Sequence, residues 1–443
     1  MLSLFTAIAG SWYFLAAIPA ACIIVYLTIV DVRAVFTLLL ICIPLSTELQ
    51  LPNGLGLDLP TEPLMVGLML VSVLLLVRQG LSIDKRPLLH PITLLLSLHI
   101  GWIAISAFLS HQPVVSFKFL AGKLWYIAPF YFLAIRMLKT EQDLKRFFWS
   151  VFAPLIVTIL IVTARHATQG FTFAEIHWVL TPFYRNHVSY AAIIVLFTPF
   201  VWFIRQWYPK GSLARWAITL SLPVLLIAIQ LSYTRAAYVA VVAAIGGSIA
   251  GLVYMINDNR YLDYAPNYET TVTHKDFNNL IQATYELEDI STMERLYRWV
   301  AGFNMSAAEP LFGFGPGNFY FFYKSYTVTS FTTYVSDNPE RSGIHNYYLM
   351  TLVEQGIPGL LLFLILIFYA LVRGEAIYAN ARTKRDKQIA MMAMLCIIII
   401  SVMQLINDLI ETDKVGPFFF MSLAILVNLD LKHRRRLQEE QGI

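Results

Sequence analysis

Three residues at the borders of apolar stretches could do chemistry: His345, Arg235 and Arg295. An imidazole has an ordinary pKa of about 6.5, so His345 could act as a general base near neutral pH. The alternative is that it caps the helix that begins beside it. A guanidinium stays charged and binds a phosphate through two hydrogen bonds, which makes both arginines candidates for an anionic ligand. Arg235 could instead extend to the lipid headgroups.

The surroundings of Arg295 distinguish it from a second arginine. Glu294 and Arg298 are four residues apart on a predicted helix and are expected to form an ion pair. Arg298 is therefore expected to be mainly structural, although it stays among the substrate-binding candidates. Arg295 is the better ligand for an external anion.

Further candidates lie close to these residues along the chain or at the same expected membrane face. Arg185 and His187 close another connection, and several cations at one face favour an anionic substrate. Contacts with lipid phosphates are the alternative. Asn346 and Tyr347 directly follow His345 and are also substrate-binding candidates.

Glu354 is an ionisable residue inside an apolar stretch, which makes it a functional candidate because a charge inside a membrane is costly. Nine residues separate it from His345. At about 100° per residue it points to the opposite side of the helix, so we expect it to brace a neighbouring helix and not to orient the imidazole. Pro358 and Gly359 predict a kink just beyond it.

The stretch 310–319 reads Pro-Leu-Phe-Gly-Phe-Gly-Pro-Gly-Asn-Phe. A single Gly-x-Gly without a preceding strand is weak evidence for phosphate binding. We interpret the stretch as a tight turn that lets aromatic residues pack closely. The sequence contains no His-x-x-x-His, His-Glu-x-x-His, Asp-x-Asp or Cys/His metal-binding pattern, so no metal or other cofactor is expected.

Membrane helices must position these residues, because 58% of the 443 residues are hydrophobic and only 14% are charged. Soluble globular proteins have about 25% charged residues, which excludes soluble enzymes and DNA-binding proteins. The three cysteines, Cys22, Cys42 and Cys396, lie inside apolar stretches and are expected to form neither a disulfide nor a metal site.

About twelve stretches approach the length of about 20 apolar residues that spans a bilayer. They are 11–30, 34–47, 63–78, 91–110, 119–136, 147–163, 188–205, 214–233, 235–256, 346–372, 388–407 and 416–430. The expected fold is therefore all-α, a polytopic transmembrane helix bundle with one long, partly helical outer loop.

The positive-inside rule assigns the connections to two faces. Lysines and arginines concentrate in 78–86, 136–146, 205–215, 373–387 and the tail from 431, which are expected in the cytoplasm. The connections 48–62, 111–117, 164–187 and 257–345 contain few of them and are expected outside.

The stretch 235–256 does not fit this alternation, because it begins and ends on the same side. It could re-enter the membrane with a break at Gly246 and Gly247. Alternatively, a second crossing is missing here, or the stretch is an ordinary span and the alternation is wrong elsewhere.

These features divide the chain into four parts: a transmembrane region 1–256, a large outer loop 257–345, C-terminal transmembrane helices 346–430 and a basic cytoplasmic tail 431–443. Aromatic residues concentrate between Phe319 and Tyr326 in the outer loop. We interpret them as a belt at the membrane interface, with sugar stacking as the alternative.

Taken together, these motifs resemble the O-antigen ligase superfamily, which also contains O-antigen polymerases and bacterial protein O-oligosaccharyltransferases. The resemblance rests on Ser-Tyr-Thr before Arg235, Glu-Arg-Leu-Tyr-Arg-Trp around Arg295 and the glycine-rich stretch. It also rests on His345-Asn-Tyr-Tyr-Leu, followed by Glu354-Gln-Gly-Ile-Pro-Gly. The motifs extend from about residue 183 to 360, and they are more specific for the superfamily than for one member.

The resemblance implies an inverting, metal-independent glycosyltransferase of the bacterial inner membrane, with its active site facing the periplasm. Its donor would be a glycan on undecaprenyl diphosphate, and its acceptor would be lipid A-core oligosaccharide, in lipopolysaccharide biosynthesis. Arg235 and Arg295 would hold the donor diphosphate, and His345 would act at the acceptor hydroxyl as base or positioner. Arg185 fits a further family arginine.

Other functions stay open at this point. An O-antigen polymerase and a protein O-oligosaccharyltransferase would differ from a ligase in the acceptor only. A lipid or polysaccharide transporter belongs to a different class and would show repeated halves, and no internal repeat is visible in this sequence.

Overall fold

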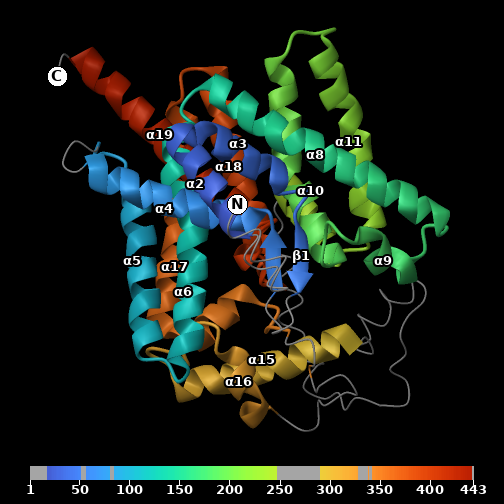
Figure 1. The fold of residues 1–443 in the computed structure, drawn as a ribbon, viewed down its shortest axis with the longest axis vertical. Coiled ribbons are helices and arrows are strands. Elements are labelled where there is room, and N and C mark those ends of the chain that lie inside the picture. Colours follow the sequence, from blue (N-terminus) through green and yellow to red (C-terminus); the bar gives the residue numbers. More distant parts are fainter. Residues whose placement is uncertain are drawn as a thin grey trace.

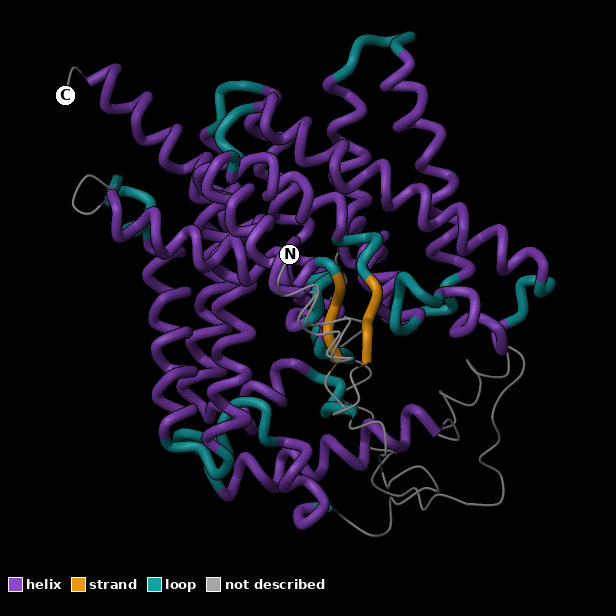
Figure 2. Tube along the Cα trace, viewed as in Figure 1, coloured by secondary structure: helices purple, strands orange, loops and turns teal. Residues whose placement is uncertain are grey.

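The computed structural model describes residues 17–50, 56–79, 84–246, 290–327, 338 and 342–441. Helices dominate the regular structure (Figures 1 and 2). The α-helices are α2 (Ala17–Val30), α3 (Val32–Cys42), α4 (Thr61–Gln79), α5 (Pro91–Phe108), α6 (Pro113–Ile127), α7 (Ala134–Met137), α8 (Glu141–Thr168), α9 (Ile176–Leu180), α10 (His187–Ile204), α11 (Leu213–Leu231), α12 (Arg235–Gly246), α15 (Ile290–Ala308), α16 (Phe319–Phe322), α17 (Tyr347–Asn380), α18 (Lys384–Met403) and α19 (Gly416–Gln441). A π-helical segment, η3 (Ala128–Leu133), joins α6 to α7, and the 3-10 segments are η4 (Phe173–Glu175), η5 (Arg205–Trp207), η7 (Tyr323–Tyr326) and η9 (Leu409–Glu411).

A helix lies in each of the twelve apolar stretches predicted from the sequence. Within the described residues, six helices are long and apolar enough to cross a bilayer: α5, α8, α10 together with η5, α11, α17 and α18. Helix α3 and residues 61–74 of α4 are apolar but shorter. The all-α class is confirmed, and the number of spans stays a prediction.

Two expectations fall partly on residues that the structure does not describe. Helix α12 ends at Gly246, so the predicted break at Gly246 and Gly247 and the remainder of the stretch to residue 256 lie outside the described residues. The same holds for residues 257–289 of the outer loop.

A short antiparallel hairpin interrupts the helical pattern in the connection 48–62. Strand β1 (Thr47–Gln50) pairs with β2 (Gly56–Leu59), with Thr47 opposite Leu59. The apolar pattern gave no expectation for this hairpin, because two strands of four residues are too short for a clear alternation.

Ion pairs join four of the basic segments at one end of the bundle. Arg385 pairs with Glu141 at 3.1 Å, Arg435 with Asp84 at 3.5 Å and Lys432 with Asp386 at 2.7 Å. This end is uppermost in Figure 1, and α15 and α16 lie at the opposite end. The side of the membrane that each end faces stays a prediction.

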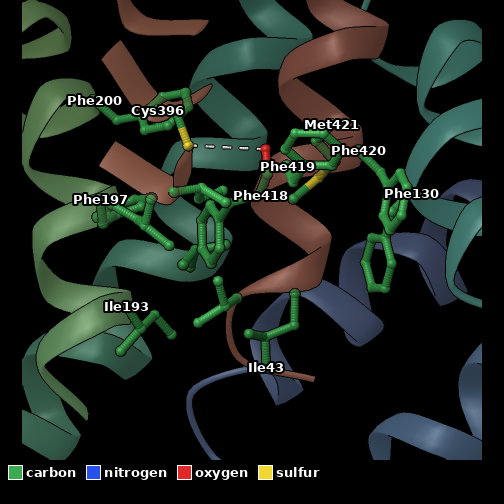
Figure 3. Close-up of a cluster of buried hydrophobic side chains, with 14 of the residues drawn as sticks. Ile43, Phe130, Ile193, Phe197, Phe200, Cys396, Phe418, Phe419, Phe420 and Met421 are labelled. Carbon is green, nitrogen blue, oxygen red and sulfur yellow. Dashed lines mark hydrogen bonds between the residues drawn. The ribbon is translucent and has the colours of Figure 1, made fainter. Parts of the chain in front are cut away.

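Aromatic side chains fill the junction of α10, α18 and α19 (Figure 3). The rings of Phe197 and Phe418 meet edge to face with centroids 6.0 Å apart, and Cys396 Sγ lies 3.8 Å from the Phe418 carbonyl oxygen. Close packing of this kind stabilises helix contacts in a bilayer, where lipid tails are as apolar as the side chains. Cys42 is also buried, Cys22 is exposed, and all three cysteines are free as predicted.

Helix α17 is broken near the point where the sequence predicts a kink. The departure from helical geometry is at Gly356, with φ 68° and ψ −175°, two residues before Pro358. A proline ring clashes with the carbonyl four residues earlier and removes one N–H group. The strain is therefore relieved N-terminal to the proline, at the residue that tolerates a positive φ.

The glycine-rich stretch satisfies the carbonyl groups that the break releases. The N–H of Phe314 donates to the Val353 carbonyl at 2.9 Å, and the N–H of Gly315 donates to the Glu354 carbonyl at 3.0 Å. Trp102 Nε1 of α5 donates to the Gln355 carbonyl at 2.7 Å. Because backbone groups inside a bilayer need internal partners, the predicted tight turn serves to close the break in α17.

Replacing Gly356 with alanine should destabilise the protein by about 1–3 kcal/mol. The positive φ disfavours an L side chain, and the added Cβ would overlap the Leu311 carbonyl oxygen. Thermal unfolding of the purified protein in detergent measures the effect. Gly101→Ala on α5 is the matched control, because its Cβ would meet nothing within 4 Å. Equal melting temperatures for Gly356→Ala and the wild type would contradict the assigned backbone conformation.

Candidate functional site

His345 directly precedes α17, and helix α15 fixes the backbone on which it stands. Trp299 Nε1 donates to the Ile344 carbonyl at 3.0 Å, and Arg298 Nη1 donates to the Gly343 carbonyl at 3.2 Å. His345 itself has φ 55°, in the left-handed region that residues other than glycine rarely adopt. Such strain is typical of functional positions, and here two side chains of α15 hold the strained residue in place.

The predicted ion pair on α15 is confirmed. Arg298 Nη2 lies 3.2 Å from Glu294 Oε2, and both side chains are buried. Arg298 therefore binds a carboxylate of its own helix and a backbone carbonyl of the neighbouring segment. Arg295 occupies a different position on the same helix, and its positive charge acts on the His345 imidazole.

Asp408 lies beside His345. His345 Nδ1 is 3.8 Å from Asp408 Oδ1, longer than a hydrogen bond, with 33% and 26% of the two side chains exposed. Burial and the charges of Arg295 and Arg298 lower the pKa of His345 to about 3. Burial raises the pKa of Asp408 above its ordinary value. The imidazole is therefore neutral at neutral pH, and the carboxylate beside it has a strengthened affinity for a proton.

Arg235 is the first residue of α12, directly after a turn attached to the connection that precedes α10. Thr234 Oγ1 donates to the His187 carbonyl at 3.2 Å, and Tyr233 OH donates to the Phe171 carbonyl at 2.6 Å. The positive charges of Arg235 and Arg295 both act on the His187 ring. Arg295 is therefore electrostatically coupled to both histidines, and Arg235 to one of them.

Arg185 lies at the edge of this group and contacts the β-hairpin. Its Nε is 3.6 Å from Glu48 Oε2 of β1, and the arginine side chain is exposed. The charge of Arg185 also acts on Asp408. The hairpin thus joins the connection before α10 to the surroundings of His345.

Asn346 and Tyr347 have structural contacts at the start of α17. Asn346 is the N-cap residue, since its Oδ1 accepts the Leu349 N–H at 3.0 Å. The Tyr347 side chain is buried, and its hydroxyl donates to Glu411 Oε1 at 2.6 Å and accepts from Lys123 Nζ at 3.0 Å. Tyr347 therefore points into the bundle, away from the exposed face of His345.

Glu354 braces the glycine-rich stretch. Its carboxylate accepts the N–H of Gly317 at 2.8 Å and that of Phe319, the first residue of α16, at 3.2 Å. The side chain is buried. The structure thus confirms that Glu354 does not orient the imidazole. We expected it to brace a neighbouring helix, but its hydrogen bonds go mainly to the glycine-rich stretch.

The structure brings together His345, Arg295, Arg298 and Asp408, with Asn346 capping the adjacent helix. Sequence analysis missed the contributions of Asp408, Glu411 and Lys123. The signal for the first two was available, because residues 404–414 are polar and acidic between two apolar stretches. Lys123 is a single cation in an apolar stretch, and 97% of its surface is buried against Glu411 and Tyr347.

Across the parts of the chain that the structure describes, no group of three or more His, Cys, Asp or Glu side chains is arranged to hold a metal ion. Residues 185–364 match the family model described as O-Antigen ligase. This match supports the resemblance to the O-antigen ligase superfamily that the sequence motifs indicate. No curated protein matches the chain.

The O-antigen ligase domain contains every site residue predicted from the sequence, from Arg185 to Glu354. Asp408, Glu411, Lys123 and Glu48 lie outside the matched range and contact the domain from other elements. The superfamily is associated with glycosyltransferases of the O-antigen ligase and polymerase type, and the six apolar helices indicate a multi-pass membrane protein.

Proposed function

We propose that this protein is an inverting, metal-independent glycosyltransferase that moves a glycan from undecaprenyl diphosphate to lipid A-core oligosaccharide. Its site faces the periplasm from the bacterial inner membrane, and the basic tail 431–443 lies in the cytoplasm. The observation that supports this most is the position of Arg295 in the O-antigen ligase domain, where its charge acts on both His345 and His187.

The proposed reaction is a displacement at the anomeric carbon of the donor sugar. An acceptor hydroxyl oxygen forms the new bond to that carbon, the bond from the carbon to the diphosphate oxygen breaks, and its electron pair leaves with the diphosphate. Arg235 and Arg295 stabilise the negative charge that develops on the leaving group, and charge stabilisation of this type is often the largest contribution to catalysis.

The hydroxyl proton goes to the His345 and Asp408 pair. In the free enzyme His345 is neutral, so its imidazole can accept a hydrogen bond from the acceptor hydroxyl. A bound diphosphate offsets the charges of Arg295 and Arg298 that lower the pKa of His345, and so it raises that pKa. Donor binding thereby makes the imidazole a stronger base when the proton is released.

The pH dependence of kcat/KM should lack an acid limb from His345 near pH 6.5, because this parameter reports groups of the free enzyme. The pKa of His345 is lowered to about 3, so the imidazole stays neutral until the pH falls toward that value. Asp58 is a separate group, with a pKa raised to about 7 by burial and by Asp413. Rates from pH 5 to 8 for the wild type and Asp58→Asn test this. A limb near pH 6.5 that persists in Asp58→Asn and disappears in His345→Gln would contradict the neutral imidazole.

Transfer by the purified protein tests the proposed function. The protein is given an undecaprenyl-diphosphate glycan in the presence of a chelator, and lipid A-core, a second lipid-linked repeat or a serine-containing peptide is offered as acceptor. Product on lipid A-core is the expected result. Product on the lipid-linked repeat would make the protein a polymerase, and product on the peptide would make it a protein O-oligosaccharyltransferase.

Transport is the outcome that would overturn the enzymatic proposal. A transporter would form no product with any of the three acceptors, yet it would bind the lipid-linked glycan and move it between leaflets. Vesicles reconstituted with the protein and a labelled lipid-linked glycan separate the two cases.

A further inference from the structure

Lys123 of α6 is a cation in the interior of the bundle, and the proposed reaction does not use it. Only 3% of its surface is exposed. Its Nζ forms an ion pair with Glu411 Oε1 and donates to the Tyr347 hydroxyl at 3.0 Å. That hydroxyl donates in turn to Glu411 Oε1 at 2.6 Å. Lys123, Glu411 and Tyr347 therefore form a closed set of contacts, which we call the buried triad.

Stability alone is a poor explanation for the buried triad. Removing two charges from water costs about as much free energy as their attraction returns, and apolar side chains of similar size often stabilise a protein equally well. Lys123 Nζ also lies 5.6 Å from the centre of the Phe420 ring, a surface that methionine could contact. The triad is better explained by the segments that it holds together.

Glu411 attaches Lys123 to Asp408 through one short turn. The turn is η9, and Asp408 is the residue that directly precedes it. The N–H of Thr412 donates to the Leu409 carbonyl at 3.0 Å, which closes the turn. Because a single 3-10 turn separates the two carboxylates, a contact that fixes Glu411 also fixes Asp408.

Tyr347 attaches the same connection to the backbone beside His345. Its N–H donates to the Gln404 carbonyl at 2.9 Å. On the other side of His345, a Cβ added to Gly343 would overlap Asp408 Oδ2. The stretch 343–347 therefore meets the connection between α18 and α19 at alternate residues, and this contact places Asp408 beside the imidazole.

Lys123 also balances a charge that acts on the site. Burial raises the pKa of Asp408, and the negative charge of Glu411 adds to this effect. Loss of the ammonium group would leave the Glu411 carboxylate partly buried without this ion pair, which is strongly unfavourable. The connection would then move to expose Glu411, and Asp408 would move with it.

We propose that Lys123 is a positioning residue, which holds Asp408 beside His345 through Glu411 and Tyr347. Lys123 itself touches neither His345 nor Asp408 and takes no part in proton transfer. The inference rests on the proposed function, in which the pair of His345 and Asp408 takes up the proton of the acceptor hydroxyl.

A double-mutant cycle in the transfer assay tests the proposal with Lys123→Met, Asp408→Asn and their combination. Lys123→Met should lower kcat about 10- to 100-fold, because a small misplacement of a reacting group has an effect of this size. The KM for the lipid-linked donor should stay within about twofold of the wild type, since donor binding is not affected. In the Asp408→Asn background the further loss should be below about threefold, because residues that act as a unit are not additive.

Two more variants complete the cycle. Lys118→Met on the same helix replaces an exposed lysine and should transfer at the wild-type rate. Tyr347→Phe removes one hydroxyl of the buried triad and should lower kcat about 3- to 10-fold, the size of one hydrogen bond. It tests the same contact if Lys123→Met does not fold. An undiminished loss from Lys123→Met in the Asp408→Asn background would overturn the proposal, as would a wild-type rate for Lys123→Met.

Hydrogen–deuterium exchange of the full-length protein separates this proposal from the proposed function, because it needs no substrate. The amides of residues 404–411 should exchange about tenfold faster or more in Lys123→Met, while those of α8 should be unchanged. Equal exchange of residues 404–411 in Lys123→Met and the wild type would overturn the positioning role. A wild-type protein that glycosylates none of the acceptors would overturn the proposed function instead.

Discussion

Replacing His345 with alanine should lower kcat for glycan transfer by about 10²- to 10⁴-fold, the range that general acid-base groups contribute. The variant loses the neutral imidazole that accepts the proton, which lies beside Asp408 and is affected by the positive charge of Arg295. It should stay folded and membrane-inserted, because Asn346, and not His345, caps α17. Initial rates with saturating lipid-linked donor and lipid A-core measure the effect.

Two further variants serve as a control and distinguish a general base from a positioning residue. His433→Ala, in the basic tail at the opposite end of the bundle, should transfer at the wild-type rate. His345→Gln keeps a side chain that can accept a hydrogen bond but cannot take up a proton. Substantial activity of His345→Gln would make His345 a positioner, and normal activity of His345→Ala would eliminate it from the reaction.

Replacing Arg295 or Arg235 with glutamine should lower kcat by about 10²- to 10³-fold, as removal of one group that stabilises a developing anion does. Both charges act on the same part of the site, around His187. Arg295→Lys should recover only part of the rate, because an ammonium group cannot bind a diphosphate with the two parallel hydrogen bonds of a guanidinium. Rates at saturating donor, compared with the affinity for undecaprenyl diphosphate, measure both effects.

Arg86→Gln is the control for general loss of charge, because Arg86 is exposed at the basic end and pairs only with Asp84 among the described residues. Its rate should equal that of the wild type. If Arg295→Gln raised KM and left kcat unchanged, Arg295 would contribute uniform binding of the donor and no stabilisation of the leaving group.

The helices could be predicted from the sequence because a bilayer demands long apolar stretches, whatever the tertiary contacts are. The break in α17 shows what apolar stretches alone do not predict, namely the exact residue at which a helix is interrupted. Pro358 predicts a kink, yet the backbone turns at Gly356. The position depends on the residues around Phe314, which approach from a distant part of the chain and satisfy the freed carbonyl groups.

The site divides in the same way between local and distant contacts. The pair of Glu294 and Arg298 follows from a spacing of four residues and could be predicted. Asp408 reaches His345 from the connection between α18 and α19, and Glu48 reaches Arg185 from a hairpin. No spacing in the sequence relates these residues, since tertiary folding alone brings them together.

The break at Gly356 also has a mechanical consequence for the site. The segment from Tyr347 to Gln355 is attached to the glycine-rich stretch, whereas the long remainder of α17 exposes Ile357, Leu361 and Phe368 as a bilayer-facing surface. The tilt of a long apolar helix is set by the helices packed against it and by the bilayer. The break lets the long arm take its own tilt, with Arg373 bound to Asp430 of α19 at 2.6 Å, while the short arm keeps the direction that the glycine-rich stretch sets beside His345.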